Sequence, residues 1–238
     1  TSESGCDTYY IHARNAILNG ISTRKNRSVP PLRYHDVLKL KELFPHINIY
    51  INGGIEDINE IKTMLDTYDG VMIGRKIYNN PMFLSEVEHI IFPTGNGSLL
   101  LGTWRGFLDI SEYKNVNLPK LHAAQSKAIE PIVAAYNHTK WTFDTKNTTV
   151  ASGISVSNPP RLNEIVDTLK NSNGSASSSY DQEALKWHEI LAKEEGIFSE
   201  KTCAFSFSSL EKLVTENAIK KDETVLIPIT GSGLKESN

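Results

Sequence analysis

The sequence predicts an α/β protein with parallel sheets, in which a partial (β/α) barrel is followed by a partial open sheet. Short apolar runs alternate with stretches of helical periodicity along the 238 residues, which is typical of strand–helix units around a parallel sheet. Three glycine-containing stretches, at 52–54, 74–75 and 94–98, follow apolar runs, and the first two lie one strand–helix unit apart. This spacing is how a (β/α) barrel builds a phosphate site.

The first segment, residues 7–91, consists of three predicted strand–helix units. The predicted strands are residues 9–11, 48–51 and 70–73, and the predicted helices are residues 37–44, 55–65 and 81–91. Pro45 ends the first helix, and Pro81 occupies the first turn of the third. A barrel closes on eight such units. Three units leave the edge strands unpaired, so we expect association through exposed edges.

The second segment, residues 93–238, begins where the rhythm of the sequence changes at Pro93. Its predicted helices are residues 99–110, 129–136, 159–169, 181–196 and 206–214, and its predicted strands are residues 120–124 and 225–227. Asp181 is predicted to cap its helix. The Ser-rich residues 171–179 form either a linker or a weak edge strand. This order of elements predicts an open α/β sheet.

The composition excludes several classes of protein. A formal net charge of −3 excludes chain-wide basicity, so nucleic acid could be bound only through a local basic patch. The two cysteines, Cys6 and Cys203, have no CxxC spacing and indicate neither a disulfide framework nor a metal site. The expected compartment is therefore reducing and cytoplasmic. No apolar run reaches the roughly 20 residues that span a bilayer.

Glycine after a parallel strand lets backbone N–H groups approach an anion closely, and successive N–H groups form a concave anion site. Asn52-Gly53-Gly54 and Gly74-Arg75 both fit this pattern, and Arg75 adds a guanidinium group. Gly95-Asn96-Gly97-Ser98 opens a predicted helix, whose N-terminus carries partial positive charge. A single glycine pair after a strand is more often an ordinary turn. The first two stretches together carry more weight than either alone.

Basic side chains gather early in the chain. His12 ends a predicted strand beside Arg14, at the edge where barrel chemistry lies, and a simple packing pair is an equal alternative. One loop around Pro30-Pro31 is crowded by Arg24, Lys25, Arg27 and Arg33. This loop is either a solvated charged loop or a contact with a nucleic-acid backbone.

Four motifs of the first segment carry a resemblance to a known family. They are His12-Ala13-Arg14, the loop Arg24-Lys25-Asn26-Arg27 with Pro30-Pro31-Leu32, Ile51-Asn52-Gly53-Gly54-Ile55, and Asp69-Gly70-Val71-Met72-Ile73-Gly74-Arg75. These motifs resemble the FMN-dependent tRNA-dihydrouridine synthases, in particular their bacterial A-type branch. The resemblance covers residues 1–92 and implies the last three units of an FMN-binding barrel.

This resemblance implies roles for particular residues. His12 would contact the flavin, and the FMN phosphate would be bound by Asn52, Gly53, Gly54, Gly74 and Arg75. The residues facing tRNA would be Arg24, Lys25, Asn26 and Arg27. The family's catalytic cysteine belongs to an earlier part of the barrel, which this sequence does not include. Cys6 corresponds to a structural position, so we expect a buried, small apolar side chain there.

The second segment carries a different resemblance. Its motifs are Pro93-Thr94-Gly95-Asn96-Gly97, Gly102-Thr103-Trp104-Arg105-Gly106-Phe107, Ala151-Ser152-Gly153-Ile154, Asn158-Pro159-Pro160-Arg161 and Thr230-Gly231-Ser232-Gly233-Leu234-Lys235. Over residues 93–238 they resemble threonine synthase, an enzyme of the pyridoxal phosphate (PLP) fold type II. The resemblance implies that Gly95, Asn96, Gly97 and Ser98 bind the phosphate of PLP and that Thr230 hydrogen-bonds its pyridine nitrogen.

The lysine that binds PLP covalently belongs to a half of the family that this sequence does not include, and no observation places Lys127 or Lys235 at the aldehyde. We therefore favour a fusion of two enzyme fragments that keeps cofactor-phosphate sites for FMN and PLP without the catalytic residues. The alternatives are a tRNA-reducing flavoenzyme completed by another chain, a similarly completed threonine synthase that converts O-phosphohomoserine to threonine, and a noncatalytic cofactor-binding module. These alternatives imply tRNA and an amino-acid substrate as partners. We expect no association with a membrane.

Overall fold

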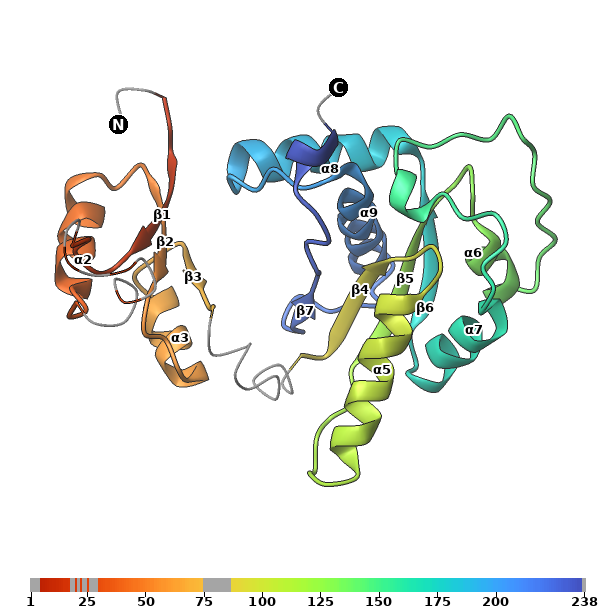
Figure 1. Cartoon of the computed structure of the whole chain (residues 1–238), viewed down its shortest axis with the longest axis horizontal. Coiled ribbons are helices and arrows are strands. Elements are labelled where there is room, and N and C mark those ends of the chain that lie inside the picture. The colour runs from red at the N-terminus through yellow and green to blue at the C-terminus, as the bar shows by residue number, and fades with distance from the viewer. Residues whose placement is uncertain are drawn as a thin grey trace. The chain divides into compact units, whose positions relative to one another are not determined.

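The structure is a computed structural model, which describes residues 5–17, 20, 22, 25, 30–74 and 87–236 (Figure 1). The chain divides into two compact units, Thr1–Leu84 and Ser85–Asn238.

The first unit is built on a three-stranded parallel sheet. Its strands β1 (Thr8–His12), β2 (Asn48–Asn52) and β3 (Gly70–Met72) lie in the order β1-β2-β3. The helices are α2 (Tyr34–Leu43) and α3 (Ile58–Leu65). Parallel strands and intervening helices are as the sequence predicts. Closure into a barrel remains a prediction, because it requires more strands than these three.

One face of the first sheet carries the hydrophobic core of this unit. Ile49 and Ile51 of β2 are fully buried and pack in one cluster with Val37 of α2. The intervening side chain, Tyr50, points to the other face because neighbouring residues of a strand alternate. It stacks there on Tyr10 of β1, with ring centroids 4.8 Å apart. Tyr10 is 44% exposed, so this second face is only thinly covered.

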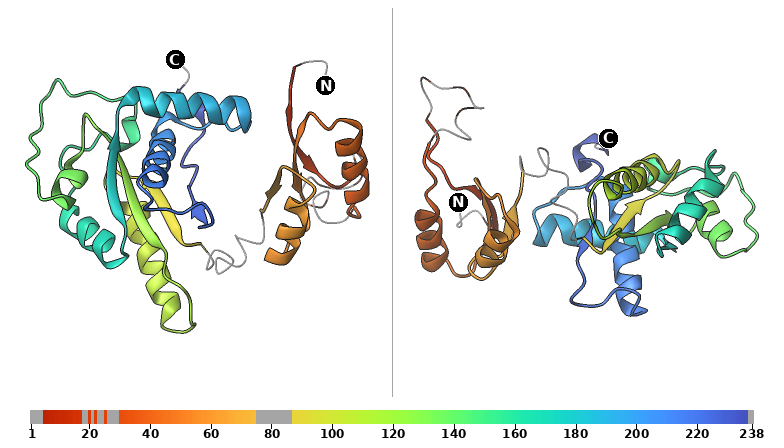
Figure 2. Two further views of the ribbon diagram at one scale, coloured as in Figure 1. Left: turned by 180° about the vertical axis from the view of Figure 1, so that it is seen from behind. Right: turned by 90° about the horizontal axis from the view of Figure 1, so that it is seen from below.

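The second unit contains a four-stranded parallel sheet. Its strands are β4 (His89–Pro93), β5 (Lys120–Ser126), β6 (Ser175–Ser179) and β7 (Val225–Leu226), in the order β6-β5-β4-β7. Its α-helices are α5 (Ser98–Ser111), α6 (Pro131–Tyr136), α7 (Leu162–Asn171), α8 (Asp181–Glu194) and α9 (Lys201–Thr215). Two short 3₁₀ helices cover Ser152–Ile154 and Gly233–Glu236. Figures 1 and 2 show α5, α6 and α7 on one face of the sheet and α8 and α9 on the other.

Two sequence predictions for this region are wrong. The helix predicted over 81–91 is replaced at its end by β4, and residues 75–86 lie outside the described part. Ile90, Ile91 and Phe92 are all buried, and a short fully apolar run has no periodicity that distinguishes a strand from a helix. Asp181 is the first residue of α8 rather than its cap. The cap position belongs to Tyr180, whose N–H donates to Glu183 at 2.6 Å.

The Ser-rich stretch forms β6, an edge strand, so the second of the two predicted alternatives is confirmed. Helix α9 begins at Lys201, five residues before the predicted start. Its first turns carry small buried side chains on several sides, including Cys203, Ala204 and Ser206. Small polar residues in the core hide the helical periodicity from a sequence reading.

The order of the strands determines where a ligand can approach the second unit. From β4 the chain passes through β5 to β6 on one side, and α8 and α9 then carry it back to β7 on the opposite side of β4. The strand order therefore reverses between β4 and β7. In open parallel sheets, ligands bind at the carboxyl ends of the strands next to such a reversal.

Candidate functional site

Two glycine-containing stretches named in the sequence follow strands that end at the carboxyl edge of the second sheet. Residues 94–97 follow β4, and residues 227–232 follow β7, its neighbour in the sheet. Among the predicted PLP-binding residues, Gly95 to Ser98 and Thr230 thus lie after adjacent strands that end at the same edge of the sheet.

The N-terminus of α5 has unused hydrogen-bond donors. Its cap residue is Gly97, at φ 76°, and no side chain caps this end of the helix. The first backbone bond joins the N–H of Leu101 to the carbonyl of Gly97 at 2.9 Å. In the described part of the chain, the N–H groups of Ser98, Leu99 and Leu100 donate to no protein atom. Such groups, at the positive end of a 14-residue helix, are suited to an anion.

Packing explains why this loop contains glycine. A Cβ atom on Gly97 would lie 2.4 Å from Cδ1 of Ile165 in α7, and one on Gly95 would lie 2.9 Å from Cγ2 of Val156. Gly97 also has a positive φ, which is unfavourable for other residues. The two glycines therefore serve the backbone and the packing of the loop, in addition to any role toward an anion.

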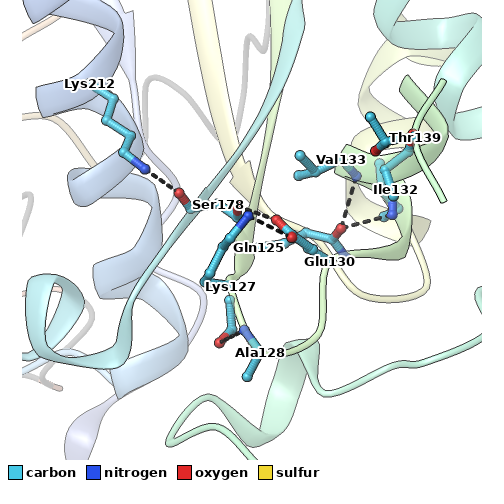
Figure 3. A network of polar contacts seen from close by, with 11 residues as sticks. Gln125, Lys127, Ala128, Glu130, Ile132, Val133, Thr139, Ser178 and Lys212 are labelled. Atoms are coloured by element: carbon cyan, nitrogen blue, oxygen red, sulfur yellow. Dashed lines mark hydrogen bonds and ion pairs between the residues drawn. The ribbon is translucent and has the colours of Figure 1, made fainter. Parts of the chain in front are cut away.

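Buried polar groups hold the loop in place. Thr94 is buried, and its N–H donates to the carbonyl of Ala124 at 2.9 Å. The side chain of Gln125, also buried, donates to the carbonyl of Thr94 at 3.2 Å. Its oxygen accepts from the N–H groups of Ile132 and Val133, at 2.8 and 3.2 Å (Figure 3). Gln125 thus caps α6 and positions the loop at α5, a role that the sequence reading missed.

Arg161 is a second residue that the sequence reading did not assign to the site. It is the cap residue of α7, and its Nη2 donates to Oγ of Ser98 at 2.8 Å. Ser98 is the first residue of α5. A guanidinium group therefore lies at the helix end whose N–H groups have no protein acceptor.

Thr230 is held by a carboxylate. Its hydroxyl donates to Oε1 of Glu200 at 2.7 Å, and the N–H of Glu200 donates to the carbonyl of Gly231 at 2.9 Å. A Cβ on Gly231 would lie 2.5 Å from the carboxylate of Glu200, so a larger residue there would require this side chain to move. Nearby, burial raises the pKa of the Cys203 thiol to about 11. This cysteine is therefore an unreactive part of the core.

In the first unit, the predicted FMN-binding residues meet at the carboxyl ends of β1 and β2. His12 pairs in register with Asn52. Gly53 has φ 117°, and a Cβ there would lie 3.1 Å from the His12 ring. Gly54 has φ 74° and would meet Leu32 at 2.5 Å. Both glycines are therefore needed for the turn itself.

Other predicted residues of the first unit are only partly placed. Gly74 follows β3, and no atom of the described residues lies within 4 Å of where its Cβ would be. Arg75, Arg24, Asn26 and Arg27 lie outside the described residues, and Lys25 is exposed. The hydroxyl of Tyr34, which the sequence reading missed, donates to the carbonyl of Gly53, and burial raises the pKa of this phenol.

Cys6 is exposed, so the prediction of a buried side chain is wrong. It lies in the turn before β1, where its thiol is 3.4 Å from the carbonyl of Thr8. Arg14 donates to the carbonyl of Pro30, which supports a packing role for this residue.

The family model for pyridoxal-phosphate dependent enzymes matches residues 72–231, which is more than half of the chain. The chain belongs to this family. The fold is also similar to that of an L-serine ammonia-lyase from the fungus Rhizomucor miehei, with a TM-score of 0.50 and 16% identity. That likeness covers 77% of this chain and 55% of the lyase, and it shows the fold alone.

Curated relatives match a second family. The tRNA-dihydrouridine(20/20a) synthase of Pseudomonas putida is 48% identical over 90 residues, which are 38% of this chain and 27% of that protein. The enzyme of the same name from Haemophilus ducreyi is 50% identical over 84 residues, or 35% and 26% of the two chains. The chain thus spans about a quarter of the length of these relatives. The resemblance to the synthases is confirmed, and that of the second segment is confirmed at the level of the pyridoxal-phosphate dependent enzymes, whereas threonine synthase in particular stays a prediction.

The donors at the start of α5 fit the phosphate that the pyridoxal-phosphate dependent family implies. They are uncapped N–H groups, the Ser98 hydroxyl and the Arg161 guanidinium, and all are donors that suit a phosphate dianion. Lys127, at the carboxyl end of β5, is the lysine to consider for covalent attachment. Its ammonium is 2.7 Å from Oε1 of Glu130 (Figure 3). It is therefore already paired with a carboxylate.

No cluster of histidine, cysteine and acidic side chains in the described part of the chain could hold a metal ion. Among the helices described, none is long and apolar enough to cross a membrane.

Proposed function

We propose that the chain is a fusion of two partial enzyme segments, which keeps a phosphate-binding site for PLP and one for FMN and does not turn over substrate by itself. The single observation that carries this proposal is the N-terminus of α5, where three N–H groups donate to no protein atom in the described part of the chain. This helix end follows β4 next to the reversal of strand order, the usual position of a ligand in such sheets.

The noncatalytic part of the proposal is supported by two side chains. PLP, when bound, supplies an electron sink for amino-acid chemistry, but the family attaches it to a lysine. Lys127 is paired with Glu130 and is therefore a poor candidate. Cys6 precedes the amino end of β1, whereas the chemistry of a barrel lies at the carboxyl ends of its strands. These two positions support a chain that lacks the catalytic group of either family.

A second candidate function is an active flavoenzyme that reduces uridine in tRNA, with its barrel completed by another chain. The identity of 48% over 90 residues to a tRNA-dihydrouridine synthase favours it, as does the position of the His12 ring beside Gly53. In that case the loop with Lys25 faces tRNA. A completed threonine synthase, with an amino-acid substrate, and a noncatalytic binding module are the remaining alternatives. A cytoplasmic location stays a prediction.

The proposal is tested by cofactor retention together with two assays. The purified chain is incubated with PLP or FMN and dialysed, and its absorption spectrum is recorded. We expect retention of PLP without selective attachment to Lys127, measured by mass spectrometry after borohydride reduction. We expect no dihydrouridine in tRNA and no threonine from O-phosphohomoserine.

The other outcomes decide between the alternatives. Formation of dihydrouridine would overturn the noncatalytic proposal in favour of the flavoenzyme, and formation of threonine would do so in favour of the PLP enzyme. Loss of both cofactors on dialysis would overturn the binding proposal itself.

A further inference from the structure

The guanidinium of Arg161 carries a positive charge that has no carboxylate partner in the described part of the chain. Arg161 donates to Ser98 at 2.8 Å and forms no ion pair with any described residue. The nearby carboxylate of Glu164 pairs instead with Arg105 of α5. Arg161 thus keeps its full charge beside the first residue of α5.

This arrangement places two charges of the same sign together. The N-terminus of a helix carries partial positive charge, so a neighbouring cation is unfavourable there and an anion is favourable. The N–H groups of Ser98 and Leu99 add donors that have no protein acceptor in the described part of the chain. The guanidinium has five N–H donors in a planar fork, and Ser98 occupies one of them. The remaining donors match the oxygens of a phosphate.

The position of Arg161 is determined by packing. Pro159 and Pro160 precede it, and the N–H of Ile165 donates to its carbonyl at 3.0 Å. The Ile165 side chain in turn packs where a Cβ of Gly97 would be. One turn of α7 therefore connects the backbone of Arg161 to the cap of α5, and the guanidinium is held at this helix end.

We propose that Arg161 is a ligand of the cofactor phosphate, and that it makes the site selective for the phosphorylated form of pyridoxal. The guanidinium supplies a charge-assisted hydrogen bond that the backbone N–H groups cannot, because it carries a full positive charge. This inference rests on the proposed function, since the phosphate is that of PLP.

The test compares Arg161→Gln with a matched control, Arg105→Gln. Arg105 lies on α5 and is 63% exposed, and its replacement removes the ion pair with Glu164 without touching the site. Affinities for PLP, pyridoxal and inorganic phosphate are measured by fluorescence titration and by the shift in melting temperature. Since a hydrogen bond to a charged group contributes about 1.5–3 kcal/mol, Arg161→Gln should weaken PLP binding about 10- to 100-fold. The affinity of Arg161→Gln for inorganic phosphate should fall similarly, and its affinity for pyridoxal should be unchanged. Arg105→Gln should bind PLP as the unmodified chain does.

Two further measurements keep the result unambiguous. Arg161→Lys retains the charge but loses the planar fork, so we expect an affinity for PLP between those of the other two proteins. Circular dichroism checks that each variant is folded. Equal affinity of Arg161→Gln and the unmodified chain for PLP would overturn this inference and leave the proposed function intact. Failure of the unmodified chain to bind PLP would overturn the proposed function, and the inference with it.

Discussion

At the scale of single residues, two buried histidines stand out. His89 of β4 and His122 of β5 are almost completely buried, and their ring nitrogens lie 2.9 Å apart. His122 also bonds Ser175 at 2.8 Å, and His89 lies 3.3 Å from a carboxylate oxygen of Glu223. Burial lowers the pKa of both, that of His122 to about 3. The pair is therefore neutral in the folded protein at neutral pH.

The first prediction is that the second unit loses stability in mild acid. Unfolded histidine has a pKa of 6.5, above the folded pKa of His122. The contribution of His122 to the free energy of unfolding is therefore complete above pH 6.5 and is lost as the pH falls toward 3. At about 1.4 kcal/mol per pH unit, the free energy of unfolding should be about 2 kcal/mol lower at pH 5 than at pH 7.5. Urea unfolding followed by tryptophan fluorescence measures this. The three tryptophans, Trp104, Trp141 and Trp187, all lie in this unit.

The variants for this prediction are His122→Gln and His138→Asn. His138 is exposed and has φ 56°, a conformation that asparagine tolerates. His122→Gln should make the free energy of unfolding less dependent on pH, and His138→Asn should leave this dependence unchanged. Parallel pH curves for the unmodified chain and His122→Gln would show that the buried pair is not the cause.

At the scale of secondary structure, helix α5 has one glycine at its cap and two in its interior, with different structural roles. Gly97 caps the helix with a positive φ and lies against Ile165. Gly102 and Gly106 are inside the helix, and no atom of the described residues lies within 4 Å of where their Cβ atoms would be. Only the first is therefore required by the fold.

The second prediction follows from this contrast. Gly97→Ala should lower the free energy of unfolding by about 1–3 kcal/mol, because the alanine would have to adopt a positive φ and its Cβ would clash with Ile165. Gly102→Ala should raise it by about 0.5–1 kcal/mol, since alanine favours a helix interior. Urea unfolding of the two variants measures both signs. A Gly97→Ala protein as stable as the unmodified chain would mean that the cap of α5 is not in this conformation.

The sequence predicted most elements of both sheets because their signals are local. The stripe at Leu162, Ile165, Val166 and Leu169 has helical spacing, and α7 covers these residues. The signal failed at β4, where Ile90 to Phe92 are apolar throughout and the periodicity is lost. It also failed at the start of α9, because Thr202, Cys203, Ala204 and Phe205 are all buried and show no helical periodicity. Burial of small polar side chains is decided by neighbours that are distant in the chain.

At the scale of the whole molecule, the first sheet ends at β3. In the described part of this unit, β3 pairs with β2 only. Met72 of β3 is 46% exposed. Strands with one open side and exposed apolar groups favour pairing with another chain.

The third prediction is therefore concentration-dependent association, measured by sedimentation velocity. Met72→Lys should weaken it, because a charge on an edge strand opposes pairing. Leu43→Lys is the control, since Leu43 is 73% exposed but lies at the end of α2, away from the strand edges. A chain that stays monomeric at all concentrations would contradict this prediction, and an equal effect of both substitutions would assign association to general hydrophobicity.

By itself, the sequence determined the α/β class, the two family resemblances and the glycine stretches after the strands, because strand periodicity and backbone freedom are properties of short segments. Only the tertiary structure decided which distant residues contact Ser98 and Thr230. Arg161 and Ser98 are 63 residues apart in the sequence, and Thr230 and Glu200 are 30 apart. These pairs meet because the strand order β6-β5-β4-β7 brings distant loops to one edge, and periodicity carries no information about strand order.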